Sequence, residues 1–166
     1  MTWSPFTPPN NPRRLPINQS PLRIVSLLER VAVPKLASSW TKEDLNNALV
    51  LAARNGDLVT AEIVLERGAD ANTKDDDTTV LMLAAENGSP QMVKALIDAG
   101  AALDAVDDQG WNAIMHANDV ENLRVLLNAG ASMTIKNENG ETALAMAIKY
   151  DQTEIVQLLK SRGAPE

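Results

Sequence analysis

The stretch that decides the fold is residues 142–164, TALAMAIKYDQTEIVQLLKSRGA, because its pattern occurs four times along the chain. It contains a short alanine-rich phrase, a second amphipathic segment and a closing Gly-Ala pair. The glycine of that pair recurs at Gly68, Gly100, Gly130 and Gly163, at spacings of 32, 30 and 33 residues. A repeat of this length indicates a row of similar units rather than one globular core.

Each unit is predicted to consist of two helices. The first helix carries the phrases ALVLAA (48–53), VLMLAA (80–85), AIMHAN (113–118) and ALAMAI (143–148). The second helix lies in the segments that end at residues 69, 101, 131 and 164. The small residues Ala52, Ala84, Ala117 and Ala147 fall at one equivalent position, where they allow neighbouring helices to approach closely. The glycine after each second helix suits a left-handed helix cap. No unit of this size buries its apolar face alone, so the units must stack.

This pattern resembles the ankyrin repeat family, whose units are a β-turn followed by two antiparallel helices. The residues that carry the resemblance are Gly68-Ala69-Asp70-Ala71-Asn72, the turn glycines Gly110 and Gly140, the inter-helix pairs Asn55-Gly56 and Asn87-Gly88, and Thr142-Ala143-Leu144. The resemblance covers residues 41–166 and implies an all-α ankyrin-repeat solenoid. Its four units are expected at 41–73, 74–106, 107–136 and 137–166.

Two departures from this pattern affect the expected structure. The turn of the second unit (74–81) is one residue shorter than its counterparts and has no glycine, so we expect a distorted hairpin tip. The third unit has 13 residues between Ala117 and Gly130, where the others have 16. We therefore expect a shortened first helix in that unit and a small gap that His116 fills.

His116 is the single histidine of the chain, and there is no cysteine. The absence of cysteine excludes disulfides, cysteine-based zinc sites and a thiol nucleophile. His116 aligns with three apolar residues of the other units, so we expect it to face the helix–helix core with a backbone partner. A metal or catalytic site would need a third group that the sequence does not supply. The consecutive Asp75-Asp76-Asp77 also lacks the alternating ligands of a calcium loop.

No enzyme activity, cofactor or metal site is therefore expected. The alternative is an enzyme that uses His116. Loss of activity in His116→Ala, with unchanged stability, would support this alternative.

The resemblance implies a concave groove formed by the turns and the ends of the first helices. Its expected partner-binding residues are Asp76, Thr78, Asp108, Gln109, Glu138 and Glu141 in the turns, Glu86, Lys149 and Tyr150 at the helix ends, and Trp111 just after a turn. Trp111 is predicted to have no core to enter. It either anchors a partner, as exposed tryptophans at interfaces do, or packs on neighbouring turns. Acidic residues dominate this set, which favours a protein partner with a basic surface.

The charge is unevenly distributed along the chain, whose formal net charge is −7. Residues 1–40 carry five basic side chains and one acidic, whereas residues 41–166 carry ten basic and 21 acidic. An acidic body repels phosphate backbones, so nucleic-acid binding is not expected. No apolar run approaches 18 residues and no secretory signal is recognisable, so we expect no membrane span and a cytoplasmic location.

The first forty residues divide into two segments. Residues 1–19 are predicted to be an extended, proline-rich basic arm, which could lie across the groove. Residues 20–40 contain a predicted amphipathic helix over 21–33 and a linker. This helix either caps the open end of the first repeat, with Val59 and Ile63 as part of its seat, or docks on a partner or a membrane surface. Thr41 is expected to cap the first repeat helix, with Asp44 as the acid of a capping box.

The sequence thus predicts a non-enzymatic protein–protein binding module that recognises a basic partner through an acidic concave groove. The alternative is a structural subunit or assembly factor, held in a larger complex by its N-terminal arm and helix.

Overall fold

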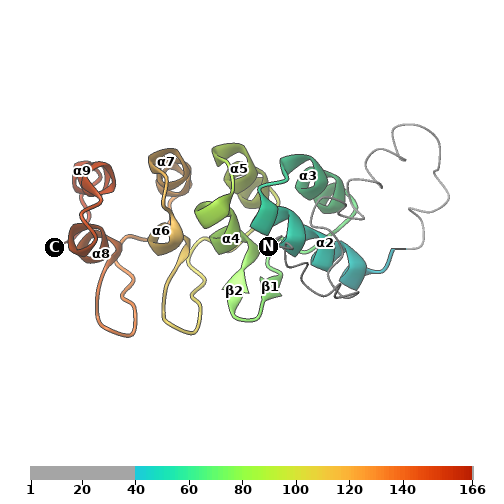
Figure 1. Cartoon of the computed structure of the whole chain (residues 1–166), viewed down its shortest axis with the longest axis horizontal. Coiled ribbons are helices and arrows are strands. Elements are labelled where there is room, and N and C mark those ends of the chain that lie inside the picture. Colours follow the sequence, from blue (N-terminus) through green and yellow to red (C-terminus); the bar gives the residue numbers. More distant parts are fainter. Residues whose placement is uncertain (1–39, 166) are drawn as a thin grey trace, which may run out of the picture.

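The computed structural model describes residues 40–165, which form four helix pairs stacked in a row (Figure 1). The pairs are α2 (Lys42–Asn55) with α3 (Leu58–Glu66), α4 (Val80–Asn87) with α5 (Pro90–Asp98), α6 (Ala113–His116) with α7 (Val120–Asn128), and α8 (Ala143–Lys149) with α9 (Thr153–Ser161). Helices α2, α4, α6 and α8 form one row, here called the inner row, and the other four form the outer row. The predicted all-α solenoid is confirmed. The arm 1–19 and the helix 21–33 lie outside the described residues.

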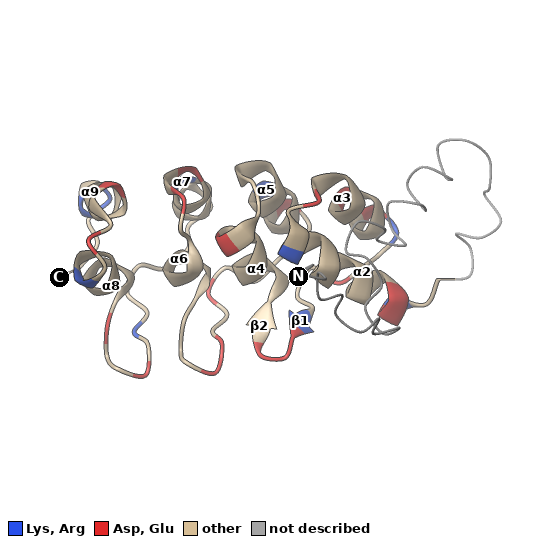
Figure 2. Cartoon of the chain, viewed as in Figure 1, with Lys and Arg blue, Asp and Glu red and all other residues tan. Residues whose placement is uncertain are grey.

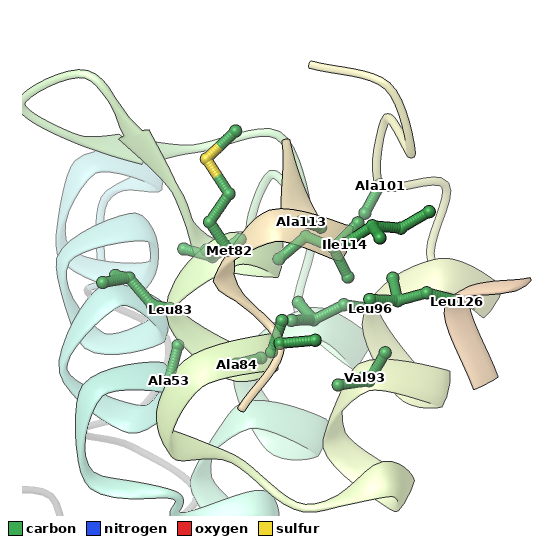
Figure 3. Packing of buried hydrophobic residues seen from close by; sticks show 14 of the residues in the cluster. Ala53, Met82, Leu83, Ala84, Val93, Leu96, Ala101, Ala113, Ile114 and Leu126 are labelled. Carbon is green, nitrogen blue, oxygen red and sulfur yellow. The ribbon is translucent and has the colours of Figure 1, made fainter. Parts of the chain in front are cut away.

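The hydrophobic core runs between the two rows and continues from one repeat to the next (Figure 3). The four equivalent alanines are all nearly inaccessible to solvent: Ala52, Ala84, Ala117 and Ala147. Their small side chains allow the inner helices to pack closely, and larger side chains from the outer row, such as Leu96 and Leu126, fill the space between the rows. The core therefore belongs to the stack and to no single repeat.

Repeats two to four each extend a finger ahead of the inner helix: finger two (74–79), finger three (107–111) and finger four (137–141). In finger two, β1 (Lys74–Asp75) pairs with β2 (Thr78–Thr79) in a regular antiparallel register. The expected distortion of its tip is therefore wrong. Asp76 adopts a left-handed conformation, with φ at 52°, and so replaces the missing glycine. Aspartate visits this region more readily than most residues do.

Fingers three and four touch each other through their backbones. The amide of Glu138 donates a hydrogen bond to the carbonyl oxygen of Gln109 at 3.0 Å. Gly110 lies so close to finger four that a Cβ placed on it would stand 3.1 Å from the Cα of Asn137. These contacts fix the two fingers relative to each other.

Side chains near the ends of repeats one and two also bind the repeat that follows. The Oδ1 atom of Asn72 accepts a hydrogen bond from the amide of Ala102 at 2.8 Å, and Oδ1 of Asp104 accepts one from the amide of Ser132 at 2.7 Å. In the fourth repeat the position equivalent to Ala102 and Ser132 is Pro165, which has no amide hydrogen to donate. The series of bonds therefore does not continue from repeat three to repeat four.

The third repeat is shortened as expected, and α6 has four residues. A buried amide compensates for part of the lost structure. The Nδ2 group of Asn122 donates to the carbonyl oxygens of Ala85 and Gly88, at 3.1 and 3.3 Å. Repeat three is thereby attached to the end of α4 in repeat two, a connection that the sequence pattern did not indicate.

The start of α2 agrees with the sequence expectation. The Oδ2 atom of Asp44 accepts a hydrogen bond from the amide of Thr41 at 2.9 Å, and the hydroxyl of Thr41 accepts one from the amide of Asp44 at 3.1 Å. Trp40 is half-buried and packs against the core. The chain therefore enters the stack at a fixed point on repeat one.

Two glycines test the contact between fingers three and four. Gly110 and Gly140 both have φ at 76°, but a Cβ on Gly140 would meet nothing within 4 Å. Gly140→Ala should therefore cost about 1 kcal/mol of unfolding free energy, for the left-handed backbone alone. Gly110→Ala should cost roughly 1–3 kcal/mol more, because the new methyl group crowds the backbone of finger four. Urea denaturation of both variants measures the difference, and equal losses would show that the fingers do not support each other.

Candidate protein-binding surface

The tips of the three fingers carry a row of exposed carboxylates (Figure 2). Asp76 and Asp77 form the tip of finger two, Asp108 lies on finger three beside the exposed Gln109, and Glu138 lies on finger four. Within residues 40–165, none of these four carboxylates is in an ion pair. The row therefore presents to solvent carboxylates that have no ion-pair partner among these residues.

The stem of finger two is attached to the first repeat. Arg54, near the end of α2, forms an ion pair with Asp75. Thr78 lies opposite Asp75 in the hairpin and is half-buried, so it contributes more to the stem than to an open surface. Glu86 is exposed at the end of α4. Of these predicted groove residues, Asp76 and Glu86 are therefore the more accessible.

In the fourth repeat, Lys149 at the end of α8 forms an ion pair with Glu141 of finger four. The Nζ atom of Lys149 lies 2.7 Å from Oε1 of Glu141 and 5.7 Å from the centre of the Tyr150 ring. The hydrogen bond from Lys149, followed by that from Asn137, lowers the pKa of Glu141, and the same bond to Glu141 raises the pKa of Lys149. Tyr150 remains 58% exposed. This part of the surface is thus an exposed aromatic ring beside an ion pair.

Trp111 does not stand free in the groove. It is half-buried, packs against the hydrophobic core, and its ring centre lies 5.5 Å from that of His116 at an interplanar angle of 58°. The expectation that Trp111 has no core to enter is therefore wrong. The reason is that the neighbouring histidine supplies a second ring against which the indole packs.

His116 has a different partner from the one expected. Its Nε2 atom lies 2.8 Å from Oδ2 of Asp107, a side-chain carboxylate and not a backbone group. The other oxygen of Asp107 accepts hydrogen bonds from the amides of Trp111 and Gln109, at 2.8 and 3.0 Å. Both side chains are largely buried. The pair thus attaches the base of finger three to α6.

The surroundings of Asp107 affect its pKa in opposite directions. Burial raises the pKa, while the hydrogen bonds from the Trp111 amide, from His116 and from the Gln109 amide lower it. The hydrogen bonds together prevail, and the net pKa is below the usual value for aspartate. Within residues 40–165, no three histidine or carboxylate side chains come close enough to hold a metal ion. The His116–Asp107 pair holds the base of finger three against α6.

A shallow depression of about 320 Å³ lies between repeats three and four, where the third repeat lacks residues between its helices. It is lined by Asn118, Val120, Asp151, Gln152, Thr153, Glu154 and Ile155. The expected gap thus opens at the surface between the two helix pairs. His116 does not line it, because the histidine is held at the base of finger three.

The role of Asp107 can be tested through pH. Its pKa is lower in the folded chain than the unfolded value of about 3.9, so its ionised form stabilises the fold above that pH and the contribution is lost as pH falls through the folded pKa. In Asp107→Asn, the unfolding free energy should fall less steeply below about pH 4, as measured by urea denaturation over a pH series.

The matched control is Asp108→Asn, whose carboxylate is exposed and makes no side-chain hydrogen bond within the described part of the chain. It should keep the wild-type pH dependence. If the unfolding free energy of Asp107→Asn fell with decreasing pH as steeply as that of the wild type, the structural role of the pair would be contradicted.

None of the helices between residues 40 and 165 combines the length and apolar character needed to cross a membrane.

Comparison with known proteins agrees with this architecture. A family model described as ankyrin repeats in three copies matches residues 49–137 and 81–165. An ankyrin repeat-containing protein from Treponema pallidum (strain Nichols) is 35% identical over 60 residues, which cover 34% of this chain and 20% of that protein. The chain thus matches about a fifth of the relative's length. Because the family model extends over most of the chain and the helix pairs and fingers follow the same repeat, the protein belongs to the ankyrin repeat family.

Proposed function

We propose that this protein is a non-enzymatic binding module that recognises a basic segment of another protein through its acidic fingers. Ankyrin repeats are generally protein–protein interaction modules. The observation that carries the finer proposal is the row of exposed, unpaired carboxylates at Asp76, Asp77, Asp108 and Glu138. Negative charges gathered on one edge attract a basic partner and orient it during encounter.

The fingers suit this role because they are held in place before a partner arrives. Finger two is attached by the Arg54–Asp75 ion pair, finger three by the His116–Asp107 pair, and finger four by its backbone bond to finger three. A surface that is already ordered loses less conformational entropy on binding. The acidic row can therefore act as a preformed template for an extended basic segment.

Tyr150 is the better candidate for an aromatic anchor. Its ring is exposed at the end of α8, whereas Trp111 is half-buried against His116. Exposed tyrosines often contribute a large share of binding energy at interfaces. We therefore infer that the preferred segment carries lysine or arginine residues together with an apolar residue that contacts Tyr150.

The involvement of the fingers can be tested with two charge-reversal variants. The first combines Asp77→Lys, Asp108→Lys and Glu138→Lys. Asp77 is chosen over Asp76 because a lysine at φ 52° would add backbone strain. The control combines Glu62→Lys, Glu66→Lys and Glu154→Lys, which makes the same change in net charge on exposed outer-row positions. Peptides selected against the wild-type protein from a random display library provide the ligand.

The selected peptides should be basic. The finger variant should bind them at least about tenfold more weakly, because three partly exposed pairs at roughly 0.5 kcal/mol each amount to about 1.5 kcal/mol. The outer-row variant should stay within about twofold, as measured by calorimetry at two salt concentrations. Acidic or neutral selected peptides, or equal losses in both variants, would contradict the proposal.

The two aromatic residues should respond differently to truncation. Tyr150→Ala should weaken binding of the same peptides by roughly 2 kcal/mol and leave the unfolding free energy almost unchanged, because the ring is exposed. Trp111→Ala should lower the unfolding free energy by about 2 kcal/mol, because it removes packing against the core and His116. Calorimetry and urea denaturation of both variants measure the two effects. A Tyr150→Ala variant with full affinity would exclude Tyr150 as an anchor.

A further inference from the structure

The first repeat exposes an apolar residue that its counterparts bury. Leu51 on α2 is 48% exposed, whereas the equivalent Leu83 on α4 is 8% exposed and Met146 on α8 is 5% exposed. Figure 3 shows that Leu83 points toward α2, the inner helix of the preceding repeat. Leu51 therefore points to the side of repeat one that faces away from α4. None of the described repeats packs on that side.

The outer helix of the first repeat adds to the same face. Ile63 on α3 is equivalent to Leu158 on α9, which is 8% exposed although no described repeat follows it. This position is therefore covered from the side of the preceding repeat. Val59 lies one turn before Ile63 and is 54% exposed. The other repeats carry polar residues at the position of Val59, namely Gln91, Glu121 and Glu154.

We propose that residues 21–33 of the same chain form a helix that covers the apolar face made by Leu51, Val59 and Ile63. This segment, PLRIVSLLERVAV, has apolar residues at helical spacing and is bounded by prolines at 21 and 34. A helix of this length measures about 20 Å, close to that of α2. It thus supplies a broad apolar stripe that can cover the open apolar face of repeat one. The inference is independent of the proposed binding function.

The point at which the chain enters the stack favours this occupant. Trp40 packs against the core, so the segment that precedes it starts from repeat one. Residues 34–40 can span at most about 23 Å when extended. Since α2 measures about 21 Å, the helix can reach the open face of repeat one directly. Any other repeat is farther from its point of attachment.

Charge complementarity points to the same face. Glu62 and Glu66 are exposed on α3, on the helix that carries Val59 and Ile63. The segment 21–33 carries Arg23 and Arg30, spaced two helical turns apart, and a single acidic residue. A helix seated on the apolar face can therefore direct its arginines toward the α3 carboxylates, which would orient it.

The test is hydrogen exchange on the full chain, followed peptide by peptide in wild type and two variants. Residues 21–33 should exchange slowly in wild type, at a rate independent of protein concentration. The double variant Leu51→Glu/Val59→Glu should accelerate exchange in this segment by at least about tenfold, the factor that corresponds to 1.4 kcal/mol. Repeats two to four should stay protected, because both substitutions are at exposed positions.

The control is Ile148→Glu, which places one such glutamate on a similarly exposed apolar position of an inner helix, 50% exposed. It should leave the exchange of residues 21–33 unchanged. Three results would overturn the proposal: rapid exchange of 21–33 in wild type, the same exchange rate in wild type and the double variant, or protection that appears only at high concentration and so reflects a second copy.

Discussion

Stacking of one repeat on the next is the interaction on which the whole structure depends. A helix pair of about 30 residues cannot enclose its own apolar side chains, so each repeat is stable only when a neighbour covers it. The four alanines of the inner helices make the stacking close, and the leucines between the rows fill the remaining space. Loss of packing at one layer therefore weakens the layers on both sides of it.

Polar contacts fix the fingers to this apolar stack. One residue at the base of each finger occupies the same position in its repeat, but it binds a different kind of partner in each one. Asp75 pairs with Arg54 of the preceding repeat, Asp107 pairs with His116 of its own repeat, and Nδ2 of Asn137 lies 3.6 Å from Sδ of Met146. In each of these three repeats a polar side chain at the base of the finger is bound to a helix, but the residue that binds it differs from repeat to repeat. The lone histidine of the chain is thereby the residue that attaches finger three to its own inner helix.

The sequence predicted the repeats, their helix pairs, the left-handed glycines and the Thr41–Asp44 cap, because each depends on residues close together in the chain. It did not predict the bond between His116 and Asp107 or the packing of Trp111, since both depend on how a finger folds back on its helix. The role of Asn122 was missed for a similar reason: its partners, Ala85 and Gly88, belong to another repeat. The regular tip of finger two required a conformation of Asp76 that composition alone does not reveal.

The proposed function requires a basic segment to bind along the finger tips of a rigid stack. The most direct test is an NMR titration of the ¹⁵N-labelled protein with a lysine- and arginine-rich peptide selected for binding. We expect the chemical-shift changes to concentrate on the tips of the three fingers and around Tyr150, while the resonances of the outer helices keep their positions in the spectrum. Changes centred on the outer row, or on the depression between repeats three and four, would contradict it.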